Sequence, residues 1–286
     1  MRRPSAIAFR RRWPRVTAAL GAGLLLACAA AYAQREFREY PGLEGAEAGA
    51  ALPADYQVPG EFVLGRLMYP PLGNGRRFGG NWKQGLSSWT IDYPLGDRNY
   101  LRLLRRLTTT HVRSVEQPVD LDDGDDVFNW PFLIASNVGS WSLTDEQAAK
   151  LREYLLRGGF LMCDSFFGTD EWAGFEATLK RVFPDRPIVE LENDHPIFHT
   201  VYELGQRSQV RNMRSLRARG VGYRTDGVTP HWRGVLDDDG RVMVAISFNN
   251  DLGDSWQYAD IPEYPQVDSF LGIRVGVNYA VYAMTH

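Results

Sequence analysis

Residues 144–164 read TDEQAAKLREYLLRGGFLMCD and carry the clearest signal for the fold. Thr144 with Gln147 three positions later is typical of a helical capping box, and apolar residues recur at helical spacing across 148–155. The Gly-Gly pair ends this helix, and the apolar run that closes at Asp164 is typical of a short buried strand. The stretch therefore predicts a helix followed directly by a strand covered on both faces.

The same alternation continues on both sides of this stretch. Strands that alternate with helices of about 10 to 15 residues imply right-handed βαβ units. We therefore predict a three-layer α/β fold, with a mostly parallel sheet and helices on both faces. The other strand candidates are 62–69, 111–115, 130–136, 188–191 and a hairpin over 235–248, and the other helix candidates are 97–107 with Asp97 as N-cap, 172–182 and 268–284.

The first 33 residues have the three zones of a bacterial secretory signal peptide. An arginine-rich start precedes an apolar stretch from Val16 to Ala31, and Ala31-Tyr32-Ala33 offers a cleavage site before Gln34. We expect a periplasmic or secreted protein with no transmembrane span in its mature chain. Two alternatives stay open: an uncleaved anchor, or a lipoprotein acylated at Cys28, because Leu25 to Cys28 resembles a lipobox.

Composition narrows the class of protein further. The leader carries six arginines and no acidic residue, so its removal changes the formal net charge from −3 to −9. An acidic surface repels phosphate backbones, which argues against a nucleic-acid partner. Cys163 would then be the one remaining cysteine, and its apolar surroundings predict a buried, inert thiol. We expect a flexible N-terminal arm over 34–60 and a single α/β domain over 61–286.

Candidate ligand-binding residues follow from the rule that open α/β sheets bind ligands beyond the carboxyl ends of their strands. Aromatic rings beside a carboxylate in the long loop before residue 97 suit a sugar, although the rings could equally pin that loop to the core. The candidates are Trp89, Asp92, Tyr93, Asp164, His195, Asn249, Asp251, Asp254 and Trp256.

Four aspartates among these candidates could carry chemistry. Asp251 and Asp254, three residues apart, could hold a hard cation or divide acid and base roles, but they are also ordinary turn residues. Asp164 closes a buried strand, where burial could raise its pKa, or it could tie a loop. His195 and His199 have the spacing of a zinc-binding pair on a helix, but Pro196 disfavours helical geometry at His195. We therefore expect a capping or core role for His195. We assign no metal and no cofactor.

Six motifs, in order along the chain, resemble a bacterial family known as domain of unknown function 4159. This resemblance implies a fold similar to the flavodoxin-like scaffold of class I glutamine amidotransferases and ThuA-like proteins. Amidotransferases need a cysteine nucleophile on a tight elbow with a histidine partner, and this sequence lacks that elbow, so glutamine hydrolysis is not implied. The motifs are W-T-I-D-Y-P (89–94), W-P-F (130–132), G-G-F-L (158–161), D-H-P-I-F (194–198), D-L-G-D-S-W (251–256) and G-V-N-Y-A-V-Y-A-M-T (276–285).

Two functional hypotheses remain. The favoured one is a non-catalytic module that binds an envelope ligand, such as a carbohydrate, or a partner protein. The alternative is a carboxylate- or metal-dependent hydrolase that acts on an envelope or sugar substrate through Asp92, Asp164, Asp251 or Asp254. A hydrolase requires at least two of these carboxylates to converge within about one bridging water of each other.

Overall fold

A seven-stranded sheet forms the centre of the fold in a computed structural model, which describes residues 37–45, 49–73 and 81–286. The strand order is β2-β1-β3-β4-β7-β6-β5. Neighbours from β2 to β7 are parallel, whereas β6 runs antiparallel to both β7 and β5. The strands are β1 (Leu64–Met68), β2 (Gln117–Asp120), β3 (Phe132–Ser136), β4 (Phe160–Asp164), β5 (Val189–Glu190), β6 (His231–Leu236) and β7 (Val242–Phe248).

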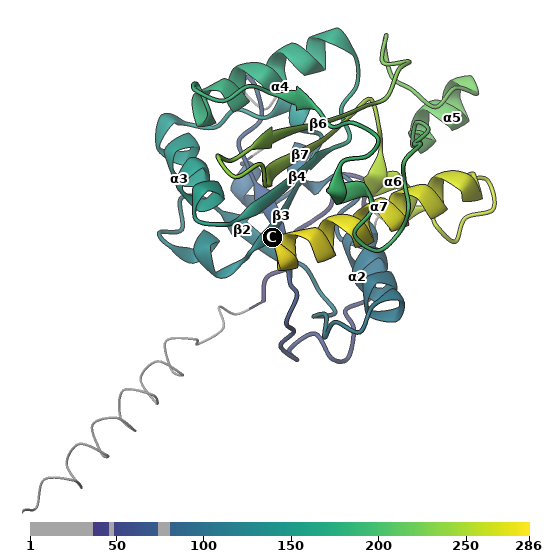
Figure 1. Ribbon diagram of the computed structural model, residues 1–286. Coiled ribbons are helices and arrows are strands. Elements are labelled where there is room, and N and C mark those ends of the chain that lie inside the picture. The colour runs from purple at the N-terminus through teal and green to yellow at the C-terminus, as the bar shows by residue number, and fades with distance from the viewer. Residues whose placement is uncertain (1–36, 46–48, 74–80) are drawn as a thin grey trace, which may run out of the picture. The chain divides into compact units, whose positions relative to one another are not determined.

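Helices cover both faces of this sheet, as the predicted three-layer α/β fold requires. Figure 1 shows α3 and α4 on one side of the strands and α2 and α7 on the other. Leu133 and Ile134, adjacent on β3, point to opposite faces and belong to two separate clusters of buried side chains. The helices are α2 (Leu95–Leu107), α3 (Asp145–Leu156), α4 (Gly168–Val182), α5 (Met213–Arg219), α6 (Leu252–Gln257) and α7 (Gln266–Thr285).

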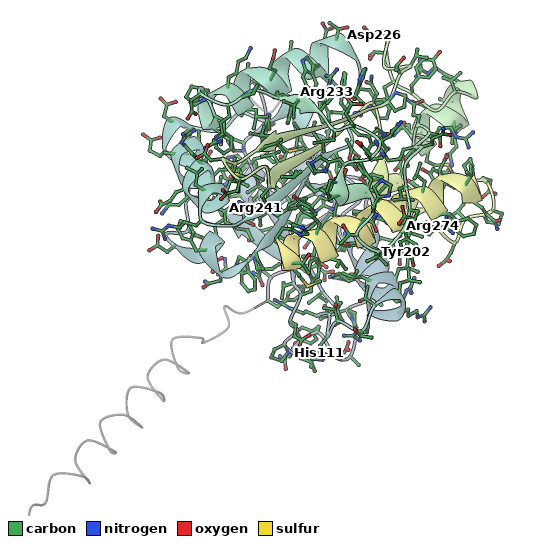
Figure 2. All side chains as sticks on the ribbon, viewed as in Figure 1. His111, Tyr202, Asp226, Arg233, Arg241 and Arg274 are labelled. Atoms are coloured by element: carbon green, nitrogen blue, oxygen red, sulfur yellow. The ribbon has the colours of Figure 1, made fainter. Side chains whose placement is uncertain are left out.

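The capping box predicted at the start of α3 is confirmed. The Thr144 hydroxyl accepts a hydrogen bond from the Gln147 amide at 3.2 Å, and the Gln147 side chain accepts one from the Thr144 amide at 3.1 Å. At the other end of α3, Arg241 from the β6–β7 hairpin, labelled in Figure 2, donates to the carbonyls of Leu155 and Gly159. These contacts fix where β4 begins.

We expect Thr144→Ala to lower the free energy of unfolding by about 1 kcal/mol, because the Gln147 amide at the start of α3 loses its side-chain acceptor. Urea denaturation measures this change. Thr109→Ala, at an exposed turn position, is the matched control and should change stability by less than about 0.5 kcal/mol. Equal effects of the two substitutions would contradict the capping role.

Several element boundaries differ from the prediction. The second strand is not 111–115 but β2, which contains Pro118, and β2 lies at the sheet edge, where a missing amide is tolerated. Helix α2 begins at Leu95, and Asp97 is not its N-cap but the partner of the buried Arg66. Helices α5 and α6 are not among the helices predicted from the sequence, and both are short.

The predicted signal peptide, its Ala33/Gln34 cleavage site and Cys28 lie outside the described residues. Within residues 37–45, 49–73 and 81–286, no helix combines the length and apolar character that a membrane crossing needs. Cys163 is fully buried in β4, and burial raises the pKa of its thiol well above the usual value.

Candidate functional site

Four aspartates meet at the carboxyl ends of β4 and β7. Asp164 ends β4, Asp251 and Asp254 lie at the start of α6 after β7, and Asp92 lies in the loop before α2. One carboxylate oxygen each from Asp92, Asp251 and Asp254 lie within 4.8 Å of one another. All four side chains are at most 4% exposed. We call these four residues the carboxylate centre.

Backbone groups of α6 hold the centre together. The amides of Leu252 and Gly253 donate to the two carboxylate oxygens of Asp164, at 3.1 and 2.8 Å. A side chain at Gly253 would collide with the Asp92 carboxylate, because an added Cβ would lie 2.1 Å from Asp92 Oδ2. Glycine at this position therefore allows Asp92 to approach the first turn of α6.

Ser165 lies among the four carboxylates. Its hydroxyl donates to Asp251 Oδ1 at 2.5 Å and lies 3.4 Å from Asp92 Oδ2 and from Asp164 Oδ2. Ser165 and Asp92 both adopt the left-handed backbone conformation, with φ of 59° and 61°. Such conformations cost free energy in residues other than glycine and are concentrated at functional sites. The strained backbone at Ser165 and Asp92 and the position of the Ser165 hydroxyl both indicate a functional site here.

The electrostatics of the centre are unbalanced. Burial, followed by repulsion from Asp251, raises the pKa of Asp164 to about 8 and the pKa values of Asp92 and Asp254 well above normal. The positive charge of Arg66 counteracts the rise in the pKa of Asp92, but the Arg66 guanidinium makes a two-point contact with Asp97. Buried charges need partners, so the centre must take up protons or a cation.

A fifth carboxylate comes from the segment before β1. Glu44 Oε2 accepts a hydrogen bond from the Asp92 amide at 3.3 Å, and burial raises the pKa of Glu44. Nearby, the Tyr40 amide donates to the Tyr93 hydroxyl at 3.2 Å. Residues 40–44 fall in the stretch predicted as a flexible arm, and they contact the 89–93 loop. The sequence held no signal for Glu44, which lies in a Gly- and Ala-rich stretch.

The loop before α5 contributes two further contacts that sequence reasoning missed. Asn212 Nδ2 donates to Asp251 Oδ2 at 2.8 Å and to Asp254 Oδ2 at 3.1 Å. The Met213 amide donates to the same Asp254 oxygen at 2.6 Å. Asn212 Oδ1 also accepts a hydrogen bond from the Ser215 amide, which makes Asn212 the N-cap of α5. Asparagine is a preferred N-cap residue, and this preference was the one signal in the sequence that could have singled out Asn212.

The three aromatic candidates lie in the core. Trp89 and Tyr93 are fully buried, and the Trp89 indole donates to the Trp82 carbonyl at 2.8 Å. Trp256 is 1% exposed, stacks on Tyr100 and donates to the Gly272 carbonyl. These rings anchor the loop and α6, and thereby position Asp92 and Asp254, but they offer no exposed face to a sugar.

The two remaining candidates form turns. His195 Nδ1 accepts a hydrogen bond from the Ile197 amide at 3.3 Å and so caps the short turn at 196–198. Asn249 has a φ of 59°, and its side chain joins the Gly168 amide to the Thr229 carbonyl. In the part of the chain that the structure describes, His195 makes no hydrogen bond to the carboxylate centre, whereas Asn249 lies two residues before Asp251 and shapes that loop.

The donor set suits a hard cation. Ca²⁺ binds oxygen ligands at about 2.3–2.6 Å, so ligands on opposite sides of the ion lie about 4.6–5.2 Å apart. The three aspartate oxygens lie within 4.8 Å of one another, close enough to bind one such ion together. One carboxylate oxygen of Asp92, Oδ1, is buried and has no hydrogen-bond partner, which leaves it available to an ion.

Fold and site together define an α/β protein with a buried acidic centre at the carboxyl edge of its sheet. A family model described as Domain of unknown function (DUF4159) matches residues 81–284, so the chain belongs to this family. The match includes all four aspartates of the centre but neither Glu44 nor β1. No curated protein matches the chain.

Proposed function

We propose that this protein is a divalent-cation-dependent hydrolase that acts outside the cytoplasm, on an amidotransferase-like scaffold without a cysteine nucleophile. The observation that carries the proposal is the convergence of Asp92, Asp251 and Asp254 oxygens within 4.8 Å. The export of the protein rests on its leader sequence alone.

The chemistry follows from the arrangement of the acids. A divalent cation polarises a substrate oxygen and makes water more acidic, and three aspartates are placed to hold it. Asp164, with a pKa of about 8, is mostly protonated at neutral pH and belongs to the same centre. It is therefore suited to donate a proton to a leaving group.

The burial of the centre favours a second candidate, a ligand-binding module whose cation is structural. Such a module would bind its ligand elsewhere, and a hollow of about 440 Å³ lies between α4 and the β5–β6 edge. Arg233, labelled in Figure 2, lies 4.4 Å from the Trp172 ring centroid in this hollow. An aromatic ring beside charged groups suits a glycan, the ligand expected of an envelope module.

Calorimetric titration tests the cation site directly. We expect the metal-stripped full chain to bind Ca²⁺ or Mn²⁺ with a Kd below about 100 µM, and saturation at 100 times Kd to stabilise it by about 2.7 kcal/mol. Absence of both heat and stabilisation with Ca²⁺, Mn²⁺ and Mg²⁺ would refute the site.

Asp164→Asn separates the two candidates. In a hydrolase this variant keeps the three cation-binding aspartates but loses about 100-fold or more in kcat, as expected for a missing general acid. Chromogenic p-nitrophenyl esters, phosphates and glycosides serve as substrates. Cation binding without hydrolysis of any of them would favour the binding module.

A further inference from the structure

An arginine-rich segment adjoins the carboxylate centre. Residues 206–224 contain six arginines and no acidic residue, although the whole chain has a formal net charge of −3. Three of them are exposed on or beside α5: Arg214, Arg217 and Arg219. Figure 1 shows α5 at the end of the molecule where α6 also lies.

The same segment reaches into the centre. Asn212 and the Met213 amide hydrogen-bond to Asp251 and Asp254, so the residue that follows them is held at the edge of the acidic cluster. Arg214 is that residue, and its guanidinium lies 3.7 Å from the Glu44 carboxylate while its side chain is 76% exposed. A solvent-facing guanidinium therefore lies next to Glu44, whose other carboxylate oxygen accepts a hydrogen bond from the Asp92 amide of the centre.

Other arginines of the segment serve to fix it in place. Arg211 pairs with Asp268 at 2.6 Å, and Arg224 pairs with Glu171 at 2.9 Å and donates to the Ser165 carbonyl. Arg217 lies one turn after Arg214 on α5, with its guanidinium 5.4 Å from the Tyr258 ring centroid. The segment is therefore anchored at both ends and presents Arg214 and Arg217 outward.

We propose that the substrate of the carboxylate centre is a phosphate monoester, whose dianionic group binds between the cation and the guanidinium groups of Arg214 and Arg217. Guanidinium groups match phosphate oxygens in geometry and charge, whereas a neutral sugar or a carboxyl ester gives them no anion to bind. This inference rests on the proposed cation site for its second positive partner.

The reaction balances without a further reactant. The oxygen of water forms a new bond to phosphorus, and the bond from phosphorus to the alcohol oxygen breaks. The departing alcohol takes the proton of Asp164, and the attacking water restores that proton. The products are the alcohol and inorganic phosphate.

Binding of phenyl phosphate to the full chain in the presence of Ca²⁺ tests the inference by calorimetry. We expect phenyl phosphate to bind, and phenyl β-glucoside not to bind. The double variant Arg214→Gln/Arg217→Gln should bind phenyl phosphate at least 10-fold more weakly. Arg106→Gln, which removes an exposed arginine in the last turn of α2, is the matched control and should bind normally. Unchanged thermal unfolding of each variant shows that it is folded.

Either of two results would overturn the inference: no binding of phenyl phosphate by the unsubstituted protein, or equal binding by the double variant. Titration with Ca²⁺ alone keeps the two proposals separate. If Ca²⁺ gives no heat but phenyl phosphate still binds in an arginine-dependent manner, the cation site is refuted and only the binding of the phosphate group by Arg214 and Arg217 stands.

Discussion

Asp92→Asn is expected to abolish cation binding and, at the same time, to make the cation-free protein more stable at pH 8. The substitution removes one of the three oxygen ligands with full charge, so the cation-dependent stabilisation of about 2.7 kcal/mol at 100 times Kd should disappear. It also removes one of the mutually repelling buried carboxylates, whose burial and repulsion raise the pKa of Asp92.

Asp92 is the best of the four positions for this experiment. Its Oδ1 has no hydrogen-bond partner, and asparagine tolerates its left-handed backbone, so the substitution sacrifices little local structure. Asp239→Asn, at an exposed hairpin position, is the matched control and should leave both quantities unchanged. Thermal denaturation with and without Ca²⁺ measures both effects. A less stable cation-free Asp92→Asn protein would show that the centre is not electrostatically strained.

The second large effect is an unusual dependence of stability on pH. Without divalent cations, the protein should lose stability as pH rises from about 4 to about 8. Asp164 has a folded pKa of about 8, against an ordinary value of 3.8, so the folded state holds more protons than the unfolded state across this range. The contribution of Asp164 is complete below pH 4 and is lost on passing pH 8, with a size on the order of 5 kcal/mol.

Urea denaturation at several pH values, in chelator, measures this slope. The slope should flatten when Ca²⁺ is saturating, because the cation replaces the protons that the centre otherwise holds. Asp164→Asn should also flatten it in the absence of cation. Stability that rises from pH 5 to pH 8 in chelator would contradict the proposed origin of the slope.

The fold was predictable where local and tertiary signals agree. The capping box at Thr144 and the apolar run of β4 gave the correct elements, and the hairpin predicted over 235–248 corresponds to β6 and β7. The prediction placed the second strand at 111–115, where Val112 and Val115 are indeed as buried as strand residues. The true strand, β2, contains Pro118, and proline is unfavourable in the interior of a sheet. Only the sheet order shows that this strand is at an edge.

The site was predictable only where its residues directly follow predicted strands. The rule about carboxyl ends selected Asp164 and the Asp251–Asp254 pair from strands that the sequence identifies. Nothing local shows that Asp92 comes within 4.8 Å of that pair, because its approach depends on Gly253 in a distant helix. Glu44 and Asn212 reach the centre from loops, and loop paths depend on tertiary contacts that periodicity does not encode.

The segment that the family model matches is shorter than the folded domain, because β1 lies before it. The family match begins at residue 81, yet β1 lies inside the sheet, hydrogen-bonded to β2 on one side and β3 on the other. A protein produced from residue 81 onward would leave the facing edges of both strands unpaired, and it would lack Arg66, which joins Asp97 to Ser136. Recombinant work on this protein therefore needs to begin upstream of Leu64, where β1 starts.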